Sequence, residues 1–199
     1  MNNFIKYLLI TLLAIFLYIQ YFNVDNDEKY ILNIIKERNE KEELFQNSSD
    51  SPIIGKNFKG LNYFKPDISY KVIAKIEKLN KKDTVLLKTS DKKEIFYIKF
   101  ARASMKINNK ELDLILYKDP ISNNKNNVHL LFNDKTNGNE TYEGGRYIDL
   151  NFKNSKRIEI DFNRAYNPYC VYNIKYSCPI PPIENRIPFK ILAGEKKYF

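Results

Sequence analysis

Short segments of alternating apolar and polar residues, separated by turns, make up most of the chain after Phe58. In residues 70–77 an apolar side chain occupies every second position, which is the pattern of a half-buried β-strand. Asn108 and Asn109 separate two further segments, and asparagine tolerates the positive φ of a tight hairpin. The expected strands cover residues 70–77, 84–89, 94–101, 105–107, 111–117, 128–132, 146–152, 157–162 and 186–192. The pattern predicts an all-β domain, a sandwich or partly open barrel of about eight short antiparallel strands.

The first residues follow a different pattern. After Lys6, the run from Tyr7 to Phe22 contains only two polar residues, and extended back to Phe4 it reaches 19 residues. That length just crosses about 30 Å of hydrocarbon at a rise of about 1.5 Å per residue. Neither a small-residue cleavage site nor a cysteine follows the run, so we expect an uncleaved signal-anchor.

The sequence therefore predicts an N-terminal transmembrane helix in residues 1–25, which contacts the membrane through residues 4–22. A short N-terminal anchor before a long domain predicts a single-pass membrane protein with its C-terminal domain on the extracytoplasmic side. Lysine and arginine residues downstream of the run leave this sidedness open, because the positive-inside rule counts charges near both ends.

Residues 27–46 are expected to form a short linking α-helix. Tyr30, Ile31, Ile34 and Ile35 are spaced as one face of a helix, and charged residues fill the opposite face. Turn and breaker residues after Gln46 end the pattern. The linking helix and its turn thus occupy residues 26–57, and the β domain occupies residues 58–199. We expect this helix to lean on the β domain.

The charge of the chain does not identify a partner. The formal net charge is +9, and a basic domain can bind nucleic acid or anionic lipid. The lysines stand singly along the expected strands and turns and form no block, so binding of nucleic acid is not expected. Glycine is scarce and no Gly-rich phosphate loop is present. We expect no cofactor.

A long loop from Asn163 to Asn185 has neither a helical nor an alternating period. Such a loop in a compact domain is usually functional or disordered, and its tyrosines argue against disorder. It contains Cys170 and Cys178, whose spacing differs from the Cys-x2-Cys of zinc and redox motifs. In an exported domain the two would most simply form a disulfide that staples the loop. Free thiols, a metal ligand or a nucleophile are the alternatives, and we expect no metal site.

The only histidine, His129, lies in an expected strand, and we interpret it as a strand residue at the edge or on the solvent side.

Gly144 and Gly145 allow a sharp turn or a close approach to a ligand. Arg146 follows directly, and its guanidinium can bind a carboxylate or phosphate through two parallel hydrogen bonds. Alternatively, the glycines form a bulge and Arg146 pairs with a nearby acid. In a regular strand Tyr147 and Asp149 share one face.

Two sets of candidate residues follow from these patterns. Polar and aromatic residues near the turn and in the long loop are candidates for ligand binding: Arg146, Tyr142, Tyr147, Asn163, Tyr166 and Asn185. Carboxylates in the same segments are candidates for acid–base catalysis: Glu184, Asp161 and Asp149.

Four runs in the second half of the chain carry a family resemblance. They are Glu140–Asp149, Asp161–Cys170, Cys178–Arg186 and Ala193–Lys196. These runs resemble the signature blocks of the DUF1684 family, a prokaryotic family of unassigned function. The resemblance covers residues 30–199 and implies a single domain, but it implies no reaction, ligand or catalytic residue. The N-terminal apolar run is not part of the family pattern.

The function that these observations favour is a membrane-anchored envelope domain, a ligand-binding or structural β module. Its ligand would be a small anion or a glycan. The alternative is a hydrolase that uses Glu184 or Asp161 as acid or base, with Arg146 stabilising developing negative charge. Whether the protein is an enzyme stays open at this stage.

Overall fold

The N-terminal part of the chain is one continuous helix. The computed structural model describes residues 3–53, 58–79 and 83–198, and for residues 19–23 it describes the helical backbone alone. Helix α1 runs without a break over Asn3–Asn47. No glycine or proline occurs in this range, so nothing interrupts the backbone hydrogen bonds of the helix. The predicted boundary between an N-terminal helix and a separate linking helix is therefore wrong.

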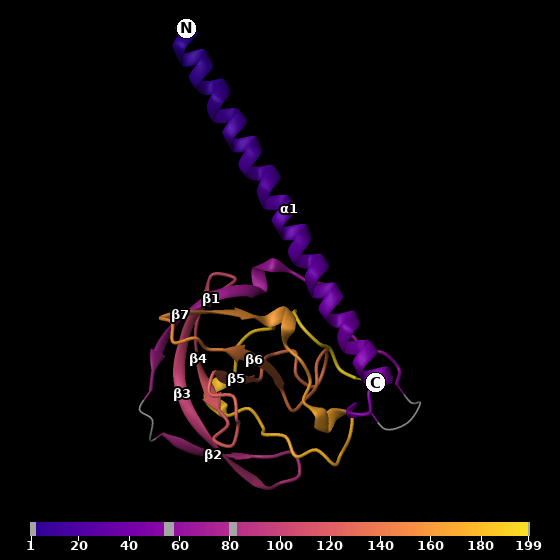
Figure 1. Ribbon diagram of the computed structural model, residues 1–199. Coiled ribbons are helices and arrows are strands. Elements are labelled where there is room, and N and C mark those ends of the chain that lie inside the picture. Colours follow the sequence, from indigo (N-terminus) through magenta and orange to yellow (C-terminus); the bar gives the residue numbers. More distant parts are fainter. Residues whose placement is uncertain (1–2, 54–57, 80–82, 199) are drawn as a thin grey trace.

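The predicted transmembrane helix is a second error. Among the residues that the structure describes, no helix is long and apolar enough to cross a membrane. The last residues of the predicted span, 19–22, have side chains outside the described part of the chain. The first half of α1 projects away from the β domain (Figure 1). Its described apolar side chains are exposed. The expected extracytoplasmic location stays a prediction.

The described part of the β domain forms one sheet that curves into a nearly closed barrel (Figure 1). Its strands are β1 (Lys71–Lys78), β2 (Thr84–Lys88), β3 (Glu94–Ile107), β4 (Lys110–Lys118), β5 (Asn127–Phe132), β6 (Arg146–Asn151) and β7 (Arg157–Asp161). All pairs are antiparallel, in the order β6-β5-β4-β3-β1-β7, and β2 also pairs with β3.

Two details of the sheet differ from the sequence pattern. Strand β3 joins two expected strands into one of 14 residues, with a register shift between Lys99 and Ala101. Residues 186–192 form no strand and contribute only an isolated bridge between Arg186 and Asn133. Pro188 lies within this segment and has no N–H to donate to a strand ladder.

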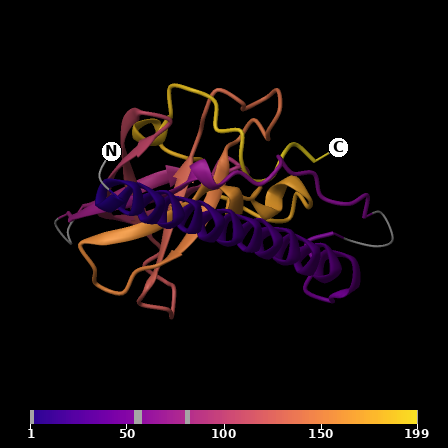
Figure 2. The ribbon, with the colours of Figure 1, turned by 90° about the horizontal axis from the view of Figure 1, so that it is seen from above.

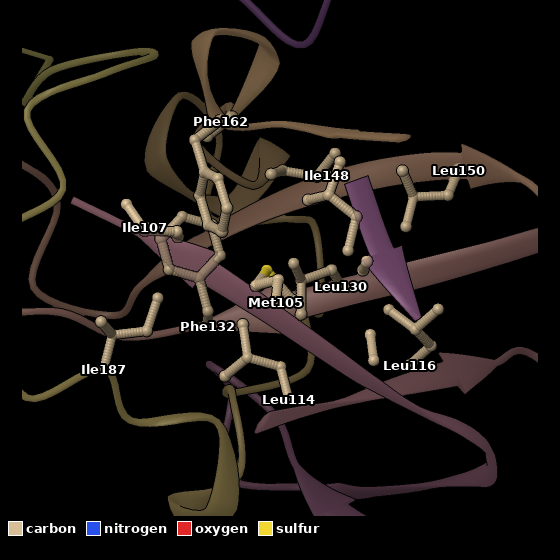
Figure 3. Close-up of a cluster of buried hydrophobic side chains, with 14 of the residues drawn as sticks. Met105, Ile107, Leu114, Leu116, Leu130, Phe132, Ile148, Leu150, Phe162 and Ile187 are labelled. Atoms are coloured by element: carbon tan, nitrogen blue, oxygen red, sulfur yellow. The ribbon is translucent and has the colours of Figure 1, made fainter. Parts of the chain in front are cut away.

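Alternation along the strands separates two apolar clusters. Leu114, Leu130, Ile148 and Phe162 pack inside the barrel (Figure 3). The other faces of β2 to β6 carry a second cluster, made of Leu87, Tyr97, Tyr117, Leu131 and Tyr147. Burial of this second cluster requires a cover on the outer face as well, and Tyr166 and Cys178 of the long loop after β7 pack against it.

The long loop is held by short 3-10 turns rather than by a regular element. The turns in the loop are η2 (Phe162–Arg164), η3 (Tyr169–Val171) and η4 (Ile183–Asn185). A further 3-10 turn, η1 (Ile68–Tyr70), precedes β1. Asp161 caps η2 by accepting from the N–H of Asn163 at 3.0 Å. The amide of Asn185 bonds to both backbone groups of Ile115, at 2.7 and 2.8 Å, and to the carbonyl of Leu131 at 2.8 Å. The ends of the loop are therefore fixed to the barrel.

Candidate functional site

A pocket of about 650 Å³ lies where α1, strand β6 and the long loop meet. Seen from above, α1 passes across the β domain (Figure 2). The helix contributes Ile34, Glu37, Arg38, Glu40, Lys41, Leu44 and Phe45 to the pocket, and the β domain contributes Tyr63, Tyr147, Asp149, Asn163, Arg164, Ala165, Tyr166, Pro168, Tyr169, Tyr176 and Cys178. This volume is within the range of small-molecule sites.

Helix α1 forms one side of the pocket because a stripe of its side chains docks on the β domain. Ile34, Arg38, Lys41 and Phe45 follow one another at spacings of three and four residues, which places them on one face of a helix. Ile34 and Phe45 are buried. The ammonium of Lys41 pairs with Glu195 at 2.7 Å, and that carboxylate is itself buried. The helix is thus an integral part of the folded domain.

Aromatic rings form most of the opposite side. Tyr147 and Tyr166 exchange backbone hydrogen bonds of 2.9 Å, and their rings meet edge to face at 5.9 Å. Tyr169 and Tyr176 form a second edge-to-face pair at 5.2 Å. Burial raises the pKa of Tyr166, and the neighbouring Asp149 carboxylate raises it further. The phenol of Tyr166 is therefore neutral near pH 7, and the four rings offer flat apolar surface to the pocket.

One cation of the pocket has no carboxylate partner. Arg38 donates to the carbonyl of Phe64 at 2.8 Å and to that of Asn163 at 3.2 Å, and its guanidinium lies 4.5 Å from the centre of the Tyr63 ring. In the part of the chain that the structure describes, no carboxylate forms an ion pair with it, and its buried Nε has no hydrogen-bond partner. Burial lowers the pKa of Arg38.

The other charges of the pocket are compensated. Arg164 binds both oxygens of Glu37 at 2.8 Å and one oxygen of Asp161 at 2.9 Å. The hydrogen bonds from Arg164 lower the pKa of Glu37. Asp161 also accepts from the hydroxyl of Tyr30, at 2.9 and 3.0 Å. These groups bind α1 to the turn after β7.

Asp149 links two other polar side chains at the edge of the pocket. One of its oxygens lies 2.7 Å from Nδ1 of His129, and the other accepts from the hydroxyl of Tyr166 at 2.9 Å. His129 and Asp149 face each other across the β5–β6 ladder. The side chain of Asp149 is half exposed, so it can also accept a hydrogen bond from a ligand.

The structure brings four of the expected site residues together. Tyr147, Asp149, Asn163 and Tyr166 all line the pocket. As strand alternation predicts, Tyr147 and Asp149 lie on the outer face of β6, and Arg146 lies on the inner face with Ile148.

Other expected site residues lie elsewhere. Arg146 has no exposed surface and pairs at 2.8 Å with Asp134, which is equally buried. Asn185, the last residue of η4, is fully buried. Glu184 accepts from Tyr117 at 2.8 Å and pairs with Lys99 at 2.7 Å. The three residues of the hydrolase hypothesis, Arg146, Glu184 and Asp161, therefore share no pocket, and each already has protein partners.

The two cysteines lie beside each other at the edge of the pocket, and both are free thiols in this structure. The backbone N–H of Cys170 donates to the sulfur of Cys178 at 3.3 Å. Tyr142 lies next to this pair. In the described residues no three side chains of His, Cys, Asp or Glu gather as metal ligands.

Sequence reasoning missed the half of the site that α1 provides. As charged residues, Arg38 and Lys41 were assigned to solvent, but they lie on the face of the helix that docks on the β domain. The available signal was their position, because Arg38 lies four residues after Ile34 and Lys41 three residues after Arg38. A charged residue in such a stripe is normally interpreted as part of the solvated face.

Fold and site together define a mostly β, barrel-like domain with an aromatic pocket that is closed on one side by a helix. The chain belongs to the DUF1684 family, described as a protein of unknown function, whose family model matches residues 56–196. This confirms the resemblance found in the sequence.

A solved structure of an uncharacterized protein from Haloarcula marismortui, determined by solution NMR, is similar to this chain. The two are 32% identical with a TM-score of 0.66, and the match covers 86% of this chain and 96% of the other. The similarity therefore extends beyond the family match into the N-terminal segment. No curated protein matches the chain.

Proposed function

We propose that this protein is a binding module whose pocket takes a small molecule that joins a carboxylate or phosphate to a ring-shaped body. The observation that carries the proposal is Arg38, a partly buried cation at a pocket of about 650 Å³ that has no carboxylate partner among the described residues. A buried charge is costly unless it is paired. A guanidinium is also well suited to bind a carboxylate or phosphate.

The remaining pocket residues support a ring-shaped body. Tyr147, Tyr166, Tyr169 and Tyr176 present ring faces and edges on one side, and aromatic side chains bury flat ligands well. Asp149 can accept a hydrogen bond from a hydroxyl of the ligand, because half of its side chain is exposed. An acidic sugar and an aromatic acid share this chemistry.

Matched ligand pairs test the proposal. Glucuronate is compared with glucose, and benzoate with benzyl alcohol, by calorimetry or by the shifts of tyrosine ring signals. In at least one pair we expect the anion to bind at least about tenfold more tightly than its neutral partner, because hydrogen bonds to charged groups contribute about 1.5–3 kcal/mol. The pair that shows the difference identifies the body of the ligand.

The variant Arg38→Gln is expected to remove this preference, with a loss of about 10- to 100-fold in affinity for the anion. Lys36→Gln is the matched control, because it removes the same charge from the same helix at a side chain that is 75% exposed and does not line the pocket. Equal affinity of wild-type protein for both members of each pair would contradict the proposal. So would an Arg38→Gln variant that binds like Lys36→Gln.

We also propose that the disulfide expected from the sequence can form between Cys170 and Cys178. Closing it would fix the segment that carries Tyr172 and Tyr176, and Tyr176 lines the pocket. The oxidised protein is expected to gain about 2–3 kcal/mol in free energy of unfolding, since the cross-link restricts the unfolded chain. Urea unfolding with and without reductant measures this, and a double Cys→Ser variant should be insensitive to reductant. Two titratable thiols after full oxidation would contradict the proposal.

A further inference from the structure

A second cavity lies beside the pocket, between strands β6 and β7, and its volume is about 270 Å³. Asp149 and Arg164 line both this cavity and the pocket of about 650 Å³, so the two spaces are neighbours at these side chains. We call the smaller space the seam cavity. It offers room for a part of the ligand that extends beyond the pocket.

The seam cavity exists because the sheet does not close at this point. In the described sheet β6 pairs with β5 and β7 pairs with β1, and no ladder joins β6 to β7. Edge strands present unpaired backbone groups to such a gap. The side chains of Asn151 and Glu159 line it as well. The seam cavity is therefore a polar space.

Asp149 stands where the two spaces meet, and its carboxylate is held in a fixed position. One oxygen lies 2.7 Å from Nδ1 of His129, and the other accepts from the hydroxyl of Tyr166 at 2.9 Å. A carboxylate has about four acceptor positions, and half of this side chain is exposed. It can therefore accept hydroxyl groups of a ligand in addition to its protein partners.

This carboxylate distinguishes the two ring-shaped bodies that fit the pocket. A sugar ring carries hydroxyls that can donate to Asp149, and its apolar face can pack on the tyrosine rings. An aromatic acid brings an apolar ring edge instead and leaves the carboxylate without a donor in place of water. A site with a fixed hydrogen-bonding group rejects ligands that lack the complementary group. The pocket therefore favours the acidic sugar.

The charges of the seam cavity favour a neutral second ring. Three carboxylates and one guanidinium line it: Asp149, Glu159, Asp161 and Arg164. Arg164 already binds Asp161 at 2.9 Å, and Glu159 pairs with Lys71 of the neighbouring strand at 3.2 Å. Like charges repel a further anionic group here. Hydroxyls can donate to Glu159 and exchange hydrogen bonds with Asn151.

We propose that the ligand is a sugar of two or more rings in which a uronic acid is joined to a neutral sugar. The uronic acid lies in the pocket, with its carboxylate at Arg38 and a hydroxyl on Asp149. The neutral sugar lies in the seam cavity against Asn151 and Glu159. This inference rests on the proposed function, because it assigns the body of the anion that Arg38 binds.

Calorimetry with the full chain tests the inference. The ligands are glucuronate, benzoate and two disaccharides, cellobiouronate and glucuronosyl-xylose, in which glucuronate is joined to a neutral second sugar. At least one disaccharide should bind at least about tenfold more tightly than glucuronate, a gain that two further hydrogen bonds of ordinary strength supply. Glucuronate should bind more tightly than benzoate. If neither disaccharide gains over glucuronate, or if benzoate binds more tightly than glucuronate, the inference is overturned.

Variants locate the second ring. With Glu159→Ala the ratio between the affinities for the disaccharide and for glucuronate should fall to about one. Glu77→Ala is the matched control, because Glu77 lies on the neighbouring strand β1 with 71% of its side chain exposed and lines neither cavity. It should keep the wild-type ratio. Asp149→Asn should lower the affinity for glucuronate relative to benzoate by about tenfold. Equal ratios in the two glutamate variants would contradict the placement of the neutral sugar.

The outcomes separate this inference from the proposed function. Anion binding that depends on Arg38, without any gain from the second sugar, overturns the inference alone. If neither glucuronate nor benzoate binds more tightly than its neutral partner, the proposed function fails and the inference fails with it.

Discussion

Replacing Arg146 with methionine is expected to lower the free energy of unfolding by about 3–5 kcal/mol, because it leaves Asp134 as a buried charge without its partner. Neither side chain of the pair has exposed surface. Arg146 also donates to the carbonyls of Ile191, at 3.0 Å, and of Ala193 and Glu195. The substitution thus frees the C-terminal segment as well, and urea unfolding measures the total effect.

The control for this prediction is Arg102→Met. Arg102 lies on β3 with about half of its side chain exposed, and its nearest carboxylate, Glu77, is 3.8 Å away. Such exposed ion pairs contribute at most about 1 kcal/mol, so the control should be close to wild type. If Arg146→Met unfolds at the same urea concentration as Arg102→Met, the structural role assigned to Arg146 is wrong.

Gly194→Ala is expected to destabilise the protein by about 3 kcal/mol or more, the sum of backbone strain and a steric clash. Gly194 has a φ of +77°, and an added Cβ would stand 2.6 Å from the carbonyl oxygen of Ala165 and 2.7 Å from that of Phe162. Both are backbone atoms beside the buried Glu195, so they cannot move aside without disturbing the site to which Lys41 binds.

Gly138→Ala separates the two causes. Gly138 has a similar φ of +82°, but an added Cβ there meets nothing within 4 Å. Gly138→Ala should lower the free energy of unfolding through backbone strain alone, by about 1–2 kcal/mol for an L-residue in the left-handed region. Thermal or urea unfolding of both variants gives the difference, which measures the close packing around Gly194. Equal losses would show that packing against Ala165 and Phe162 contributes nothing.

The strands were predictable because their signal is local. Seven of the expected segments correspond closely to β1, β2, β4, β5, β6, β7 and the first part of β3. Alternation also predicted that Tyr147 and Asp149 share one face, since successive side chains of a strand point to opposite sides. The strand expected at residues 186–192 is absent because Pro188 has no N–H for a strand ladder, and the segment contributes only an isolated bridge.

The helical region was mispredicted because composition changes along α1 but conformation does not. The apolar run and the charged amphipathic stretch suggested two helices, yet no residue between them breaks a helix. For Arg146 the sequence left two alternatives open, anion binding and pairing with a nearby acid, and the structure shows the second. A turn followed by arginine suggests anion binding, and only the tertiary structure shows that Asp134 and three carbonyls already surround this guanidinium.

By itself the sequence determined the strand segments, the family and the part of the chain that holds the long loop, because these depend on neighbours in the chain. The tertiary structure decided which residues meet. Lys41 pairs with Glu195, Tyr30 with Asp161 and Ser90 with Cys178 across separations of 154, 131 and 88 residues. No local pattern encodes such contacts, because they depend on how the barrel closes and where α1 docks. For that reason the pocket between α1 and the β domain is visible only in the folded structure.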